Sequence, residues 1–489
     1  MMHVWKKQSQ KTSWLGIAGI ALGVLGVGVW LTVRSPFLGV LAAAIGVGFA
    51  TALVWSATLT HRRLIITLLV SSILLPGIPV PGLLQVRLEE LIVLALLPVI
   101  LTRIRGRLNR VDVCFGLVGI STMISMAWGQ WGKGIFLSPR DFMELIKLVK
   151  FWLFFRLTLY RWTEDDLRSI TYWLLGSIGI AALVGLVQWK NWMGIGMLTK
   201  MLYGQGSVHV SKVRVIGTVE SPIYFSLLMV AGQSFIVSAL QWYKHKWVLV
   251  ALWGLCLAIV TFTSSRTGIL AVGIVLSVTV GLRIIWLRRI SLRWWLISVA
   301  VALVVVLMIR FTAGTWLLNE LESLEVMNAV EKFEYSQQGP IHYFVFRFDA
   351  LEEGKNARIA MWQDNLAIFQ ESPLIGWGPG KSVQGTITDN GYVLYLRRYG
   401  VIGLAFYLLL YWQVLRFCWK LLRIYPYQSV MWAMGLAILA ITLAYLAANM
   451  FVEVIYELQL MSVFWLIVGI GYSALYFRTE EHKKLVCKA

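Results

Sequence analysis

Apolar residues dominate the chain in runs of about twenty, and short polar segments separate these runs. Runs of this length predict membrane-spanning helices, because about 20 helical residues cross the hydrocarbon core of a bilayer. The third and sixth runs are the weakest. The fold class we expect is therefore an all-α polytopic membrane protein with about 12–14 transmembrane helices. The fourteen candidate spans are 14–33, 36–57, 64–78, 86–102, 111–128, 142–160, 168–189, 222–242, 247–263, 266–287, 292–310, 400–418, 428–450 and 457–477.

The polar connections indicate an orientation. If the N-terminus is cytoplasmic, every second connection is cytoplasmic too, and each of those is short and basic, as in "RIRGRLNR" (103–110) and "RRISLR" (288–293). Short cytoplasmic loops are enriched in Lys and Arg, so the pattern predicts that both termini are cytoplasmic. The opposite orientation would put this whole set outside.

Composition agrees with this interpretation. The chain is 58% hydrophobic and 14% charged, with a net charge of +20. In a membrane protein such a charge indicates cytoplasmic loops before it indicates nucleic-acid binding. The four cysteines have no paired spacing, so neither a disulfide framework nor a zinc site is expected.

Two longer segments, 190–221 and 311–390, fall on the outer face in this topology. The second contains "ARIAMWQDNLAIFQESPLIGWGPG", whose helical apolar spacing is followed by a Pro/Gly-rich turn, so we expect an ordered cap. The predicted division is an N-terminal transmembrane bundle (1–189), a core transmembrane region (190–310), a large extracytoplasmic loop (311–390), and C-terminal transmembrane helices with a cytoplasmic tail (391–489).

Three spans that run inward begin on the outer face, and their first residues favour anion binding. In "FTSSRTGILAV", Ser264 and Ser265 are N-cap candidates just before Arg266. Ser221 and Pro222 begin a second helix, with Arg214 upstream. Asp389 or Asn390 would cap the third. Because a helix N-terminus has unsatisfied N–H groups and Arg contacts phosphate in bidentate fashion, this face is suited to an anion such as a phosphate.

Each candidate has a simpler explanation as well. Arg266 could be a snorkelling membrane anchor, Arg214 a surface residue, and Asp389 only a helix cap. Lys147 and Lys150, in "RDFMELIKLVKFW", could contact lipid phosphate, but an interfacial amphipathic helix is the commoner origin of this pattern.

Four segments together resemble the superfamily of O-antigen ligases and polysaccharide polymerases. They are "VRVIGTVESPIYFS", "FTSSRTGILAV", "ARIAMWQDNLAIFQESPLIGWGPG" and "TDNGYVLYLRRYGVIGL", in this order across about 210–420. The resemblance implies a GT-C-type glycosyltransferase of the bacterial cytoplasmic (inner) membrane. Such an enzyme takes a glycan from a polyprenyl-pyrophosphate carrier (undecaprenyl pyrophosphate) on the extracytoplasmic side. The two outer arginines of the family correspond to Arg214 and Arg266.

The resemblance also bears on the reaction. Where the ligases have a histidine as the proposed base, this chain has Asp389, which favours a polymerase of the teichuronic-acid or capsule type. The expected enzyme needs no metal and no cofactor. Its partners would be the lipid-linked donor, a glycan or lipid acceptor, and membrane lipids. An alternative is a ligase that moves glycan to a lipid or protein acceptor. A lipid-linked oligosaccharide flippase or transporter is an alternative from another class, but it should carry charges deep in several spans.

The candidate site follows from these interpretations. Asp389, Arg266 and Arg214 are the expected catalytic residues, with Asp389 accepting the acceptor's proton and the arginines stabilising the leaving diphosphate. The expected substrate-binding residues are Ser264, Ser265, Arg358, Asn390, Tyr392, Arg398, Lys147 and Lys150.

Overall fold

The structure is a computed structural model. It describes residues 61–76, 87, 89–90, 92–93, 108–194, 196, 203, 214–287, 348–380, 388–427 and 429–486. The spans predicted at 14–33, 36–57 and 292–310 lie outside these residues, as do most of 86–102 and much of the loop predicted at 311–390.

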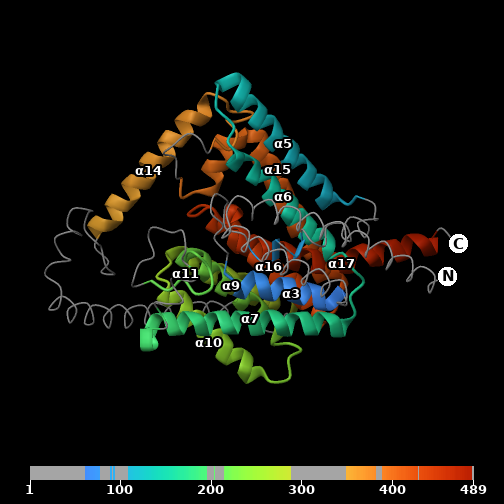
Figure 1. The fold of residues 1–489 in the computed structure, drawn as a ribbon. Helices are drawn as coiled ribbons and strands as arrows, with labels where there is room; N and C mark the ends of the chain where they lie inside the picture. The colour runs from blue at the N-terminus through green and yellow to red at the C-terminus, as the bar shows by residue number, and fades with distance from the viewer. Residues whose placement is uncertain are drawn as a thin grey trace, which may run out of the picture. The chain divides into compact units, whose positions relative to one another are not determined.

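Every regular element in the described ranges is helical (Figure 1). The α-helices are α3 (His61–Leu74), α5 (Arg110–Lys133), α6 (Pro139–Leu157), α7 (Glu164–Lys190), α9 (Pro222–Ala239), α10 (Lys246–Phe262), α11 (Arg266–Leu287), α14 (Phe348–Gln370), α15 (Gly391–Ile424), α16 (Val430–Ala448) and α17 (Leu458–Val486). Two short 3₁₀ turns, η1 (Trp192–Gly194) and η2 (Val454–Tyr456), join them.

Seven of the described helices are long and apolar enough to cross a membrane, which confirms an all-α polytopic membrane protein. They lie in α5, α7, α9, α11, α15, α16 and α17, and α10 is a shorter apolar helix. The weak sixth span forms as α6 but is not among the seven. Its charges at Asp141, Glu144, Lys147, Lys150 and Arg156 account for this difference.

The described residues of 1–109, 148–177 and 462–489 form one compact unit. Its helices meet through aromatic and ionic contacts. The Phe155 ring of α6 packs edge-on against Trp465 of α17, with ring centroids 6.4 Å apart. Arg62 of α3 pairs with Asp166 of α7 at 3.3 Å.

The described residues of 110–147 and 178–461 form the other unit. Here α9 packs against α10, α11 and α16, and α15 packs against α5, α14 and α16. Most of α9 and α16 is buried, as expected for helices that are apolar all round. The N-terminal residues of α9, α11 and α15 are the ones that this unit brings into the candidate site.

Helix α15 is interrupted at Gly400, whose φ of 64° and ψ of −170° break the helical hydrogen-bond pattern. In a continuous helix, the carbonyls of residues 397 and 398 would accept from the amides of 401 and 402. Segment 373–378 satisfies all four groups instead. The bonds run from Trp377 N to Arg397 O (3.0 Å), Gly378 N to Arg398 O (2.7 Å), Val401 N to Pro373 O (2.9 Å) and Ile402 N to Leu374 O (3.2 Å).

This segment is the Pro/Gly-rich turn expected after the helical pattern of 357–370. Gly400 has to be glycine, because a Cβ there would lie 2.3 Å from the Leu374 carbonyl. The Ser125 hydroxyl of α5 donates to the Ile375 carbonyl at 2.6 Å, which ties the segment to α5 as well.

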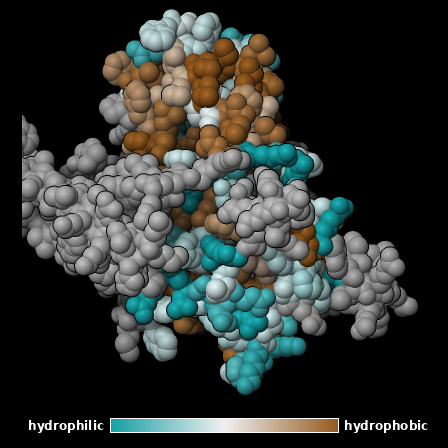
Figure 2. Space-filling view, turned by 90° about the vertical axis from the view of Figure 1, so that its right-hand side faces the viewer, coloured by the Kyte–Doolittle hydropathy of each residue, from teal (hydrophilic) through white to brown (hydrophobic). Residues whose placement is uncertain are grey.

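Exposed apolar side chains gather on α5 and α15, and Figure 2 shows a broad hydrophobic surface. Trp128 and Ile124 contribute from α5, and Val401, Leu408 and Trp412 from α15. Surface of this kind is what a helix presents to lipid.

Candidate functional site

Helix α11 begins where the sequence predicted. The backbone amide of Gly268 donates to the Ser265 hydroxyl at 3.0 Å, so Ser265 caps the helix and is itself buried. Ser264 does not cap it. Its φ of 53° makes it the left-handed residue of the turn between α10 and α11. Arg266 follows as the first helical residue, and its side chain is exposed.

Arg214 lies against the same turn. Its Nε donates to the carbonyl of Thr263 at 3.1 Å, three residues before Arg266. The loop that carries Arg214 is held from α7, where the Gln188 side chain bonds both the amide (2.7 Å) and the carbonyl (2.8 Å) of Gly217. The two predicted arginines thus share one turn, although 51 residues lie between them in the sequence.

Helix α9 begins beside them with the predicted cap. The Ser221 hydroxyl accepts from the amide of Ile223 at 3.3 Å, and Pro222 is the first helical residue. One turn on, the Tyr224 hydroxyl donates to the backbone carbonyl of Glu453 at 3.5 Å. The carboxylates of Glu457, Glu453, Asp389 and Glu220 all interact electrostatically with this phenol.

The start of α15 decides between the two predicted caps. Asn390 caps the helix, because its side-chain oxygen accepts from the amides of Tyr392 (3.0 Å) and Val393 (3.2 Å). Asp389 is left free of capping, with a φ of 45°. Next to it, the Thr388 hydroxyl donates to Glu453 Oε1 at 2.7 Å. Tyr392 donates to the carbonyl of Leu446 in α16, so its hydroxyl anchors α15 to a neighbouring helix.

Asp389 faces an arginine of α14. Arg358 Nε lies 3.6 Å from Asp389 Oδ2, and the two side chains are 43% and 45% exposed. The sequence proposed Arg358 as a substrate contact and Asp389 as a base, but it gave no reason to pair them.

Arg398 and Lys147 meet around one tyrosine. The guanidinium of Arg398 lies 4.8 Å from the centre of the Tyr456 ring, and the Lys147 ammonium lies 5.8 Å from it. Glu144 Oε1 is 3.7 Å from Lys147 Nζ and 4.0 Å from Arg398 Nη1. Burial raises the pKa of the Tyr456 phenol; Arg398 opposes this shift and Glu144 adds to it. The phenol is therefore neutral at physiological pH.

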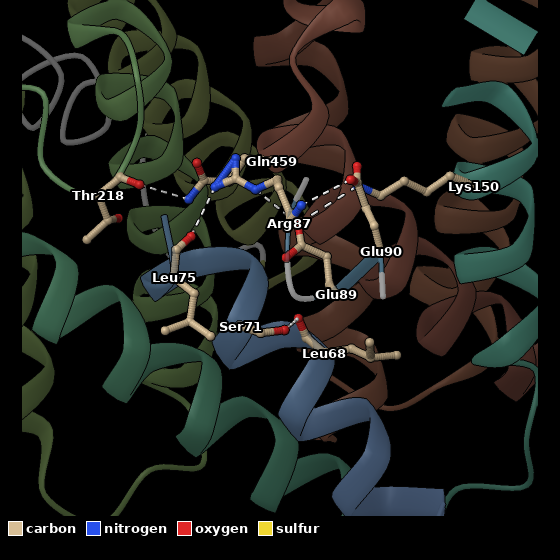
Figure 3. Close-up of polar contacts among 9 residues, drawn as sticks. All are labelled: Leu68, Ser71, Leu75, Arg87, Glu89, Glu90, Lys150, Thr218 and Gln459. Atoms are coloured by element: carbon tan, nitrogen blue, oxygen red, sulfur yellow. Dashed lines mark hydrogen bonds and ion pairs between the residues drawn. The ribbon is translucent and has the colours of Figure 1, made fainter. Parts of the chain in front are cut away.

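Lys150, one turn further along α6 from Lys147, has different surroundings (Figure 3). It lies in the other compact unit, where its Nζ is 2.8 Å from Glu90 Oε1 and 3.8 Å from Glu89 Oε1. Arg87 Nε is 3.1 Å from Glu89 Oε1, and Arg87 also donates to the carbonyl of Leu75 at 3.1 Å. We call these four residues, Arg87, Glu89, Glu90 and Lys150, the buried ion cluster.

The structure therefore brings Arg214, Ser264, Ser265 and Arg266 together at one turn, and Arg358, Asp389, Asn390 and Tyr392 together at another. Tyr224 and Glu453 stand beside the second turn, and the sequence alone did not indicate them as neighbours of Asp389. Sequence reasoning also missed Trp362, Asn365 and Tyr456. Within the described ranges, no group of three or more His, Cys, Asp and Glu side chains is arranged to hold a metal ion.

Residues 250–408 match a family model described as O-antigen ligase. The matched stretch contains Arg266, Arg358, Asp389 and Arg398, and it confirms the resemblance drawn from the sequence. No curated protein matches the chain.

Proposed function

We propose that the chain is a polysaccharide polymerase, on the premise that residues 250–408 match the family model described as O-antigen ligase. It transfers a glycan from a polyprenyl-pyrophosphate carrier to a growing cell-surface polysaccharide. The reaction takes place at the extracytoplasmic face of a bacterial cytoplasmic membrane, with Asp389, Arg266 and Arg214 as the catalytic residues.

The observation that carries the proposal is the hydrogen bond from Arg214 to the Thr263 carbonyl. It holds one guanidinium at the turn from which Arg266 and the N-terminus of α11 begin. The Ser265 hydroxyl accepts from the Gly268 amide, and the other amides of a first helical turn have no partner within the helix. Two arginines beside such amides form a site for a diphosphate.

The reaction needs three changes. The acceptor hydroxyl oxygen forms a bond to the anomeric carbon of the donor glycan. The bond from that carbon to the diphosphate oxygen breaks, and its electron pair leaves with the polyprenyl diphosphate. The hydroxyl proton passes to the Asp389 carboxylate. Negative charge grows on the leaving diphosphate, where Arg214, Arg266 and the start of α11 stabilise it.

Ser264, Ser265, Asn390 and Tyr392 shape the two turns in this proposal. Arg398 and Lys147, which lie over the Tyr456 ring, would contact glycan there. Lys150 belongs to the buried ion cluster, where it pairs with Glu90, so we do not propose that it contacts substrate. An acceptor that is itself a lipid-linked repeat makes the enzyme a polymerase. A lipid or protein acceptor makes it a ligase. This is the second candidate, because the family model that residues 250–408 match is described as O-antigen ligase.

The test is a transfer assay with purified protein in lipid nanodiscs and a synthetic polyprenyl-diphosphate-linked oligosaccharide. A ladder of products that lengthens with time is the polymerase outcome, and a single added glycan on a lipid acceptor is the ligase outcome. We expect Arg266→Lys to lower the rate by about 10²-fold, because it keeps the charge but loses the planar fork. Lys246→Arg, an exposed cation at the start of α10, is the control and should leave the rate unchanged. No transfer from the donor by the wild-type protein would refute the proposal.

A further inference from the structure

We infer that one face of α14, formed by Arg358, Trp362 and Asn365, positions the turn that carries Asp389. The inference rests on the proposed function, since it gives these residues a role in the same transfer reaction. Arg358 then acts through Asp389 and not through the substrate.

The three residues are spaced i, i+4 and i+7, so they lie along one side of the helix. Each contacts a different part of the chain around the start of α15. Arg358 Nε lies 3.6 Å from Asp389 Oδ2. The Trp362 indole N–H donates to the carbonyl of Thr388 at 2.7 Å.

The third contact is buried. Asn365 Oδ1 accepts from Arg397 Nη1 at 3.2 Å, and both side chains are almost fully enclosed. The Asn365 amide is itself oriented, because its Nδ2 donates to the Met361 carbonyl at 2.7 Å. The base of the α14 face is therefore rigid, and its outer end, at Arg358, points to the half-exposed carboxylate.

The turn at Asp389 needs this support. Its φ of 45° is a conformation that Asp adopts only with some strain, so the turn must be held from outside. Two contacts hold Thr388, the residue before Asp389: its carbonyl accepts from the Trp362 indole, and its hydroxyl donates to Glu453. Arg358 then sets the direction of the carboxylate itself.

The expected effects on stability and on rate distinguish a positioning role of Arg358 from a purely structural one. An ion pair with both side chains more than a third exposed contributes little to the free energy of unfolding. Loss of Arg358 should therefore leave the fold intact. A misplaced catalytic group, by contrast, can cost about 10²-fold in rate for a 1 Å shift.

The experiment compares Arg358→Gln, Arg358→Lys and Trp362→Phe in the transfer assay. We expect Arg358→Gln to lower kcat by about 10- to 100-fold, with the KM for the lipid-linked donor nearly unchanged. Arg358→Lys should recover part of the loss, because a cation remains opposite Asp389. Trp362→Phe keeps an aromatic ring but removes the indole N–H, and should lower kcat by a smaller factor. Asp364→Asn, an exposed charge on the same helix, is the control.

A double variant distinguishes a positioning role of Arg358 from a structural one, because it tests whether the effect of Arg358 depends on the Asp389 carboxylate. If Arg358 acts only through Asp389, Arg358→Gln should cost nothing further in an Asp389→Asn background. Independent, multiplying effects would overturn the inference, as would a raised KM with unchanged kcat or a normal rate in Arg358→Gln. Each of these outcomes leaves the proposed function standing as long as the wild-type protein transfers glycan; absence of wild-type transfer overturns both.

Discussion

The buried ion cluster and the turns at Arg266 and Asp389 hold their charges in opposite ways. In the buried ion cluster, two cations face two carboxylates, and the Glu89 side chain is fully enclosed. At the α11 turn, the Arg266 side chain is exposed, and no described residue forms an ion pair with it. At the α15 turn, Asp389 and Arg358 are both nearly half exposed.

The difference separates charges that stabilise the fold from charges that are accessible to a ligand. A buried charge that loses its partner is costly, so the buried ion cluster is a part of the protein that cannot change without consequence for stability. An exposed charge contributes little to stability and is accessible to a substrate. The comparison predicts that substitutions in the first region lower stability, whereas substitutions in the second lower activity at normal stability.

The largest effect on activity is expected from Asp389→Asn. The substitution removes the proposed proton acceptor, and general-base catalysis typically contributes about 10²–10⁴-fold to the rate. The helix should stay intact, since Asn390 is the cap and Asn tolerates the positive φ found here. The measurement is kcat in the transfer assay beside the thermal midpoint of the purified protein. Normal transfer by this variant would make Asp389 part of the turn only and direct the search for a base to Glu453 and Glu220.

A second effect, on stability, is expected from Glu89→Gln. It leaves Arg87 and Lys150 opposite a single carboxylate in a buried site, which should cost about 3–5 kcal/mol. The readout is a lower thermal midpoint in detergent and lower abundance in the membrane. Glu164→Gln in the exposed pair with Arg168 is the matched control, with an expected change of less than about 0.5 kcal/mol. A stable Glu89→Gln protein with lost activity would contradict the division between the two regions.

The smallest effect separates two neighbouring serines. Ser265→Ala removes the cap of α11 and should cost about 1 kcal/mol. Ser264→Ala should cost less, because its side chain does not cap the helix. The thermal midpoints of the two variants, measured side by side, test this order, and equal midpoints would show that the cap contributes nothing.

Local signals made part of the site predictable. The starts of α9 and α11 could be predicted because Ser221, Pro222 and Ser265 act within their own turn. The choice between Asp389 and Asn390 could not, because both side chains are good caps and only the backbone geometry distinguishes them. The resemblance to the superfamily also depended on short motifs, and it was confirmed for residues 250–408.

The parts of the site that could not be predicted depend on contacts between residues far apart in the sequence. Arg358 and Asp389 are separated by segment 359–388, and the i, i+4, i+7 pattern of α14 looks the same whether that face meets lipid, water or protein. Lys147 and Lys150 are three residues apart, which suggested a shared role, yet they contact different partners, Tyr456 for one and Glu90 for the other. No periodicity could assign these partners, because they come from far along the sequence.

The interruption of α15 at Gly400 has a consequence for how the protein is made. A helix that enters the bilayer alone must satisfy its own peptide groups, but α15 leaves four of them to segment 373–378. That segment is synthesised first, so it is already present when α15 emerges from the ribosome. We therefore expect α15 to complete its backbone hydrogen bonds only when it docks onto this segment, because an undocked α15 would leave four peptide groups without a partner.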